Sequence, residues 1–124
     1  MENLPERRKR YQLVRHRDRS VIAGDVQVAT SWLARMKGLL GRCGLADTEA
    51  LVLPNCHSVH TIGMRFAIDV VFVDRSFRIV KIYEAVCPGK LLPPAWFAWG
   101  AVEFSSGAVV RLGLKSGEQL ELVK

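Results

Sequence analysis

The segment FAIDVVFV-DRS-FRIVKIYEAV, residues 66–86, carries the strongest fold signal in the chain. Residues 66–73 are rich in β-branched and aromatic side chains, as is typical of a strand, and residues 77–86 form a second run of this kind. Residues 74–76, Asp-Arg-Ser, lie between the two runs and favour a turn. Two β-prone runs that flank a three-residue connection predict a β-hairpin.

Short apolar runs separated by turn-forming residues continue on both sides of this hairpin. The run 21–28 alternates, and the turn-prone Gly24–Asp25 divides it into two expected strand pieces. Further short strands are predicted over the ranges 51–53, 101–104, 109–114 and 119–123. The sequence therefore favours many short strands joined by tight turns.

One segment instead has the spacing of a helix. Thr30 or Ser31 can act as an N-cap, and Gly41 and Gly44 bracket the expected end. Between them apolar side chains recur every three or four residues, at Trp32, Leu33, Met36, Leu39 and Leu40. This spacing predicts one amphipathic helix of about three turns.

Together these elements predict a mainly β (α+β) fold. We expect a small single-domain antiparallel barrel or strongly curved sheet with one short amphipathic helix. A parallel α/β architecture would need a crossover helix between successive strands, and the sequence offers only one good helix.

The positive charge is concentrated at one end of the 124-residue chain, which has a net charge of +6 and an isoelectric point near 9.7. Seven basic and three acidic side chains within residues 1–20 give +4, so the other 104 residues carry only +2. We expect residues 1–20 to form a basic, largely mobile N-terminal tail and residues 21–124 to form a single β-rich domain. Such a tail usually serves solubility, and less often binds phosphates.

Composition and cysteine content exclude several classes of protein. Hydrophobic residues make up 49% of the chain and charged residues 24%, unlike a fibrous repeat or a fully disordered chain. Cys43, Cys56 and Cys87 are too few and too widely spaced for a disulfide framework. Basic residues 7–10 interrupt the apolar region that a secretory signal requires, and no window is apolar enough for a transmembrane span. We therefore expect a reduced, cytoplasmic protein.

The densest chemical stretch is CHSVHTIGMR, residues 56–65. If this stretch is extended, Cys56 and His60 share one face. They could then bind a soft metal together with another cysteine, or form a nucleophile–base pair. The spacing matches no paired zinc motif and no protease or transferase signature, so we expect no metal, no cofactor and no catalytic residue here. The simpler interpretation is a buried thiol and a histidine bonded to backbone.

A second group of polar residues lies beside or within apolar strands. Asp69 and Glu103 each interrupt a strand, where a lone carboxylate is costly unless it is paired. Arg65 could pair with either of them, or a carboxylate could hold the amides of a turn. Alternatively these residues line a polar cleft in which Arg65 and His60 bind a small anion. The ligand-binding candidates are His60, Thr61, Arg65, Asp69 and Glu103.

An aromatic segment follows the hairpin. Residues 87–100 read CPGKLLPPAWFAWG, and their three prolines and two glycines exclude a central strand. Trp96, Phe97 and Trp99 are expected to close one end of the barrel. If they were exposed instead, they would form the rim of a ligand or partner site.

The order of these motifs resembles domain-of-unknown-function family 192, a small bacterial and archaeal family. Residues 38–42, Gly-Leu-Leu-Gly-Arg, are similar to its helix end, and residues 58–74 are similar to its most recognisable block. Residues 102–104 with Gly107 resemble its Leu-Glu-Leu and following glycine, whereas Gly117–Glu118 stands where Gly-Asp is usual.

The resemblance covers residues 25–123 and implies a compact bacterial β-rich domain with a short helix, but no reaction. It also implies that His60, Arg65, Asp69 and Glu103 form one cluster. Many relatives are exported or lipid-anchored, a location that the absence of a signal in this chain does not favour.

Three hypotheses for function follow. The first is a non-enzymatic module that binds an unknown small ligand or protein partner through a polar cleft around His60, Arg65 and Asp69. The second is a hydrolase or transferase that uses His60 with Cys56 or a carboxylate, which requires those side chains to converge on one reacting position. The third is binding of nucleic acid or an anionic surface through the basic tail.

Overall fold

The computed structural model describes residues 11–30 and 42–124. Their regular structure consists of seven strands and one short helix: β1 (Tyr11–Arg15), β2 (Val21–Val28), β3 (Glu49–Pro54), β4 (Ile68–Val73), β5 (Ile79–Val86), β6 (Gly100–Ser105), α2 (Ala108–Leu112) and β7 (Leu120–Val123). The helix expected between residues 32 and 40 and the first ten residues of the expected tail lie outside the described residues.

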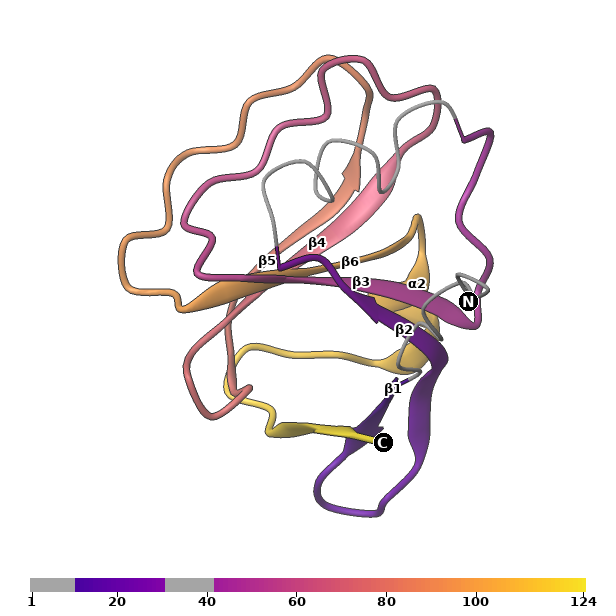
Figure 1. Ribbon diagram of the computed structural model, residues 1–124, viewed down its shortest axis with the longest axis vertical. Helices are drawn as coiled ribbons and strands as arrows, with labels where there is room; N and C mark the ends of the chain where they lie inside the picture. The colour runs from indigo at the N-terminus through magenta and orange to yellow at the C-terminus, as the bar shows by residue number, and fades with distance from the viewer. Residues whose placement is uncertain (1–10, 31–41) are drawn as a thin grey trace, which may run out of the picture.

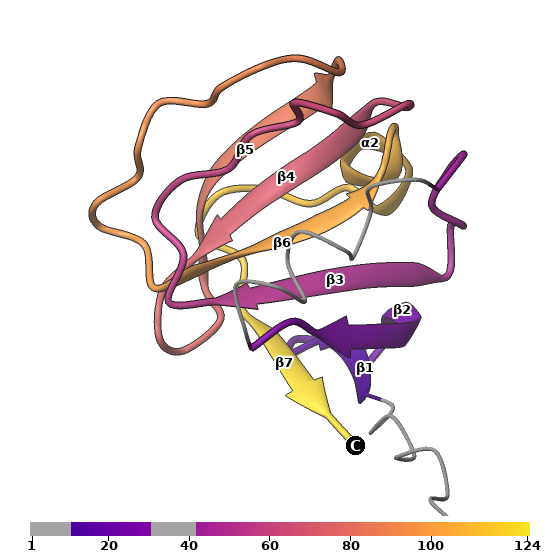
Figure 2. The ribbon, with the colours of Figure 1, turned by 45° about the horizontal axis from the view of Figure 1, so that its top comes forward.

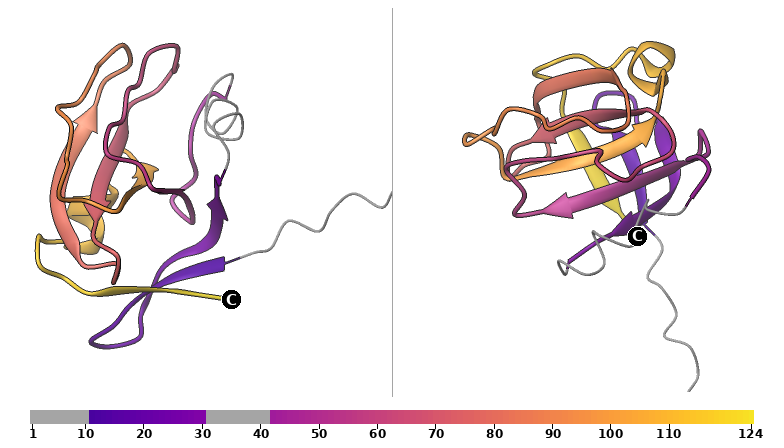
Figure 3. Two further views of the ribbon diagram at one scale, coloured as in Figure 1. Left: turned by 60° about the vertical axis from the view of Figure 1, so that its left-hand side comes forward. Right: turned by 90° about the horizontal axis from the view of Figure 1, so that it is seen from above.

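All seven strands belong to one sheet in the order β5-β4-β6-β3-β2-β1-β7. Every neighbouring pair is antiparallel except β2 and β3, which are parallel. The sheet curls into a half-barrel, as Figures 1 and 3 show. At one end its two edge strands approach each other, because Ile79 N donates to Glu118 O at 2.9 Å and Leu120 N donates to Phe77 O at 3.0 Å. The predicted fold class, a small mainly β domain with a strongly curved sheet, is confirmed.

The predicted hairpin is β4 and β5. Its turn is held by the Asp74 carboxylate, whose Oδ1 accepts from Ser76 N at 2.9 Å and from Arg78 N at 3.0 Å. The strands expected over the ranges 51–53, 101–104 and 119–123 are also present, as β3, β6 and β7. Local β-propensity and turn residues were sufficient signals for all of these elements.

Two predicted elements are wrong in detail. The run 21–28 is one continuous strand, because the expected break at Gly24–Asp25 is accommodated as a register shift against β1. Residues 109–114, expected to be a strand, instead contain most of helix α2. Gly107 and Gly113 flank this helix in left-handed conformations, with φ of 91° and 65°, and thereby permit its sharp start and stop.

The expected boundary of the N-terminal tail at residue 20 also differs from the structure. Residues 11–15 are β1, which pairs with both β2 and β7. Leu13 is fully buried, and the guanidinium of Arg15 lies 2.7 Å from the Glu118 carboxylate. The ordered sheet therefore begins before the predicted domain start, and part of the basic segment contributes to the core.

Apolar residues are buried on both faces of the sheet. The concave face holds one cluster that includes Val71, Val102, Phe104 and the α2 residue Val109. A second cluster, which we call the outer cluster, lies on the opposite face of β3, β4 and β6; its buried members are Ala29, Leu51, Leu53, Cys56, Val59, Ile68, Val70, Phe72, Val86, Leu92, Ala95, Ala98 and Ala101. In Figure 2 the long loop that precedes β4 crosses in front of β4 and β5, and the long loop that precedes β6 runs around the outer side of these strands.

No helix in the described ranges is long and apolar enough to cross a membrane.

Gly100, at the start of β6, stands where a side chain would meet the backbone of the neighbouring strand. It pairs with Pro54 on one side and Val73 on the other, and a Cβ built on it would lie 2.5 Å from Leu53 O. We expect Gly100→Ala to lower the free energy of unfolding by about 1–3 kcal/mol, because the neighbouring strand must shift.

Chemical denaturation would measure this loss. Gly24→Ala is the matched control, since a Cβ at that strand position meets nothing within 4 Å, and it should change stability by less than about 0.5 kcal/mol. Equal stability of the two variants would contradict the steric argument.

Candidate functional site

The two loops that cover the outer cluster are residues 55–67 and 87–99. Thr61 joins them: its hydroxyl donates to Cys87 O at 2.7 Å and accepts from Lys90 N at 2.9 Å. Backbone bonds continue the contact, from Leu92 N to Val59 O at 3.0 Å and from Ala95 N to His57 O at 2.7 Å. Thr61, a predicted ligand-binding residue, is fully buried and holds the two loops together.

His60 and Arg65 lie on the exposed surface of the first loop. His60 pairs with Leu91 in an isolated β-bridge, and its Nδ1 lies 3.3 Å from Ile62 N. Among the described residues, Arg65 has no ion pair or hydrogen bond through its side chain, so it does not pair with Asp69 or Glu103 as the sequence suggested.

Asp69 is fully buried and holds backbone amides together. Its Oδ1 accepts from Ala85 N at 2.8 Å, and its Oδ2 accepts from Val109 N at 2.9 Å in the first turn of α2. Ala85 has a φ of 48° beside a register shift between β4 and β5. The carboxylate therefore fixes both a strand irregularity and the start of the helix, which matches the alternative that a carboxylate holds the amides of a turn.

Glu103 lies on the opposite face of the sheet from Asp69. Asp69 pairs with Phe104, so consecutive β6 residues place Glu103 with Leu51 and Val70 on the side of the outer cluster. Its carboxyl group is buried and, within the described parts of the chain, has no hydrogen bond or ion pair. Burial disfavours its charged form and raises the pKa of Glu103 to about 7.

The predicted cluster therefore does not form one open cleft. Thr61, Asp69 and Glu103 are buried in separate places, and only His60 and Arg65 are exposed. The family resemblance implied that His60, Arg65, Asp69 and Glu103 form one cluster. Their positions in the structure do not support this expectation.

The expected shared face of Cys56 and His60 is also wrong. Cys56 is buried in the outer cluster, where its thiol lies 2.9 Å from Ser58 O, whereas His60 is exposed. Cys43 and Cys87 are exposed. Within the described ranges, no three His, Cys, Asp or Glu side chains are grouped as metal ligands would be.

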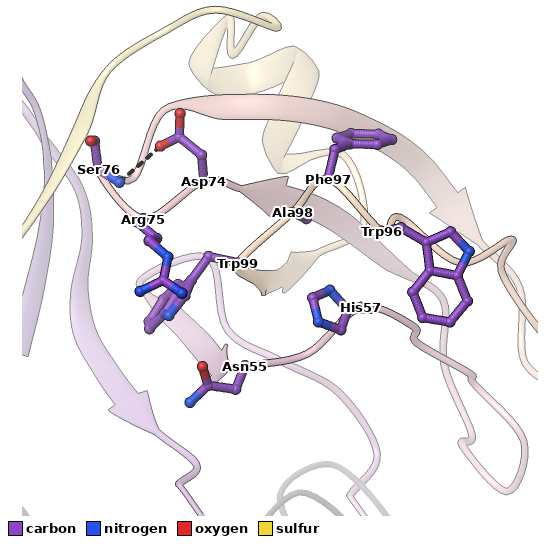
Figure 4. A pocket seen from close by; sticks show the side chains of 9 residues that line it. All are labelled: Asn55, His57, Asp74, Arg75, Ser76, Trp96, Phe97, Ala98 and Trp99. Carbon is purple, nitrogen blue, oxygen red and sulfur yellow. Dashed lines mark hydrogen bonds between the residues drawn. The ribbon is translucent and has the colours of Figure 1, made fainter.

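The aromatic segment is arranged differently from the expected barrel plug. Trp96 and Phe97 are 75% and 65% exposed, whereas Trp99 is half-buried and packs on Phe77 with ring centroids 5.5 Å apart. These rings border a pocket of about 490 Å³, which we call the aromatic pocket; its lining residues are Asn55, His57, Asp74, Arg75, Ser76, Trp96, Phe97, Ala98 and Trp99. Figure 4 shows this arrangement.

Sheet topology explains why these residues meet. Strands β3 and β4 both run antiparallel to β6, so they run parallel to each other and end at the same edge. Trp99 connects the two ends through its backbone, because its N donates to Val73 O at 2.8 Å and its O accepts from Cys56 N at 3.1 Å. The residues after β3, after β4 and before β6 therefore converge at one place.

Three residues of the aromatic pocket, Asn55, His57 and Arg75, were not predicted as site residues. His57 and Arg75 belong to a polar stretch and a turn that the sequence predicted, but only the pairing order shows that the turn after β4 lies beside the residues after β3. An Asn at the end of a strand and an Arg at a hairpin tip are weak signals, since both are common in ordinary turns.

The fold and the aromatic pocket define a small β-protein with a curled sheet and a surface pocket where strands β3 and β4 end. Residues 13–122 match the family model DUF192, described as "Uncharacterized ACR", and the chain belongs to this family. The suspected family is thereby confirmed. A comparison with curated proteins gives no match.

Two solved structures share the fold. One is a protein of unknown function from Novosphingobium aromaticivorans, 24% identical, with a TM-score of 0.75 over 90% of this chain and 83% of that one. The other, from Sinorhizobium meliloti, is provisionally named a transcription regulator; it is 22% identical, with a TM-score of 0.72 over 90% of this chain and 91% of that one. At this identity the likeness concerns the fold alone.

We expect Asp69→Ala to lower the free energy of unfolding by about 2–4 kcal/mol, because it leaves the buried amide of Val109 and the partly buried amide of Ala85 without an acceptor. Asp69→Asn keeps one acceptor oxygen and should lose less. Denaturant melts would measure the loss, and hydrogen exchange should accelerate at the Ala85 and Val109 amides in particular. An Asp69→Ala protein with wild-type stability would show that the carboxylate does not hold these amides.

Glu103 should make stability depend on pH. Its pKa is about 7 in the folded chain against an ordinary value of 4.5, so the folded state binds the proton more tightly. The stabilisation is complete below about pH 4.5 and is lost as pH rises through about 7. Relative to Glu103→Gln, which does not titrate, the wild type should lose about 3 kcal/mol over that range.

Denaturation at a series of pH values would measure this difference. The control is Glu84→Gln, at an exposed position on β5, which should follow the wild-type pH profile. Parallel profiles for the wild type and Glu103→Gln would show that Glu103 ionises normally in the folded protein.

Proposed function

We propose that this protein is a non-catalytic binding module that holds a small ligand in the aromatic pocket. The observation that carries the proposal is the exposure of Trp96 and Phe97 at the border of that pocket. Large aromatic side chains on a soluble domain normally bury most of their surface, and an exposed group of them beside a concavity is typical of a binding site. The volume of about 490 Å³ is in the range of small-ligand sites.

The backbone around the aromatic pocket supports this proposal. Trp99 is fixed by bonds to the ends of β3 and β4, and Ala98 N donates to Ala95 O at 3.0 Å. His57 is held through its carbonyl, which accepts from Ala95 N. A site whose walls are already ordered costs less entropy to occupy than one that must fold around its ligand.

The other two hypotheses have less support. An enzyme that uses His60 with Cys56 needs the two side chains to converge, but one is exposed and the other lies in the outer cluster. The two buried carboxyl groups, Asp69 and Glu103, do not line the aromatic pocket. A role for the basic segment in binding anionic surfaces concerns mainly residues 1–10, which lie outside the described residues.

Ligand binding that depends on Trp96 would test the proposal. Fragments from a broad small-molecule library should shift the amide NMR signals of residues 55–57 and 96–99. Trp96→Ala should weaken their binding by about tenfold or more, because one stacked aromatic contact is worth about 1–3 kcal/mol. At a hundred times its dissociation constant, a binder should stabilise the wild type by about 2.7 kcal/mol.

Leu91→Ala is the matched control, because Leu91 is 73% exposed on the same loop but does not line the aromatic pocket. It should leave binding unchanged. Fragments that bind near His60 and Arg65, and that bind Trp96→Ala as tightly as the wild type, would place the site on the first loop and overturn the proposal.

A further inference from the structure

The aromatic pocket offers flat surfaces for a ring. The rings of His57 and Trp96 have centroids 5.8 Å apart and an interplanar angle of 42°. Figure 4 shows His57 between Trp96 and Trp99, with Asn55 beside it. The ring of Trp99 packs against the ring of Phe77, so its position does not depend on a ligand. Aromatic side chains arranged in this way favour a planar, unsaturated ring over a branched aliphatic group.

The same pocket contains one positive charge that no carboxylate neutralises. Arg75 is exposed, and its guanidinium has no ion pair within residues 11–30 and 42–124. In Figure 4 its side chain extends from the turn after β4 toward Trp99 and Asn55. An unpaired guanidinium beside aromatic rings can bind a carboxylate or phosphate through two parallel hydrogen bonds.

The one acidic residue that lines the aromatic pocket is already engaged elsewhere. The Asp74 carboxylate accepts from the amides of Ser76 and Arg78, and Figure 4 shows it directed away from His57 and Asn55. Phe77 N donates to Asp74 O at 3.0 Å and completes the turn. The backbone that carries Arg75 is therefore fixed, while the negative charge of Asp74 serves the turn and not the pocket.

We infer that the ligand of the aromatic pocket is a small organic anion that carries a flat ring: an aromatic carboxylate or a ring-bearing phosphate. The ring would pack among the aromatic side chains of the pocket, and the anionic group would bind Arg75. This inference rests on the proposed function and adds the charge and shape of the ligand to it. A neutral ring would not use Arg75, and an anion without a ring would not use the aromatic side chains.

Ring compounds with and without an anionic group test this inference. Adenosine monophosphate is compared with adenosine and with inorganic phosphate, and 2-naphthoate is compared with 2-naphthamide, each by isothermal titration or NMR titration. We expect at least one charged ring compound to bind about tenfold tighter than its neutral partner, as one charge-assisted contact provides. The two pairs also distinguish a phosphate from a carboxylate as the preferred anion.

Arg75→Gln should remove this preference for charge, so that both members of a pair bind with the affinity of the neutral one. Arg75→Lys keeps the charge without the bidentate geometry and should retain part of the preference. Arg65→Gln is the control, because Arg65 is also exposed but does not line the aromatic pocket, and it should behave as the wild type.

The outcomes separate the inference from the proposed function. Neutral and charged probes that bind equally, with both losing affinity in Trp96→Ala, would leave the binding module intact and overturn the anion preference. A preference that Arg65→Gln removes and Arg75→Gln keeps would also overturn it. If no ring compound binds in a way that depends on Trp96, the proposed function itself fails and the inference fails with it.

Discussion

Burial of the sheet on both faces is the constraint on which the rest of this structure depends. Every residue of β4 and of β6 is buried, so each strand must be covered on its concave and its convex side. The curl of the sheet and α2 cover the concave side. Among the described residues, the loops 55–67 and 87–99 cover the convex side. These loops must be held in one conformation, because only a well-packed layer keeps water from an apolar face. The hydroxyl of Thr61 helps to hold them through its bonds to Cys87 and Lys90.

In a sheet that is buried on both faces, a polar side chain needs a hydrogen-bond partner within the protein. The two buried carboxyl groups, Asp69 and Glu103, differ in whether they have one. A shift of one residue in register moves a side chain to the other face, so Asp69 and Glu103 are separated by the sheet although their strands are neighbours. Asp69 finds two amides, one at a strand irregularity and one in the helix. Glu103 finds neither, and its raised pKa is the consequence of burial without a partner.

Several elements of this fold are encoded by residues close to them in the chain. The hairpin, three of the other strands and the curved mainly β architecture follow from propensity and turn residues within a few positions of each element. Helix α2 does not, since Val109 and Val110 favour a strand locally, and the helix depends on flanking glycines and on Asp69, 40 residues away in the chain.

The candidate site was harder to predict than the fold for the same reason. The cluster of His60, Thr61, Arg65, Asp69 and Glu103 was predicted from polarity and from the family resemblance. Strand register places Asp69 and Glu103 on opposite faces of the sheet, and the other three residues lie on the loop before β4. The exposure of Trp96 and Phe97 could not be read from their hydrophobicity, which predicts burial. The proximity of Arg75 to these rings depends on the order of strands in the sheet, which no short stretch of sequence contains.

The aromatic pocket combines a backbone fixed by the sheet with side chains that belong to turns and loops. Its backbone is fixed where β3 and β4 end beside Gly100, a part of the sheet that tolerates little change. Its side chains, in contrast, come from turns and loops, where substitution leaves the strand ladder intact. Two structures that share the fold at 24% and 22% identity show that most positions can change within this scaffold. The scaffold therefore fixes where the aromatic pocket lies, and the loop residues decide which side chains line it.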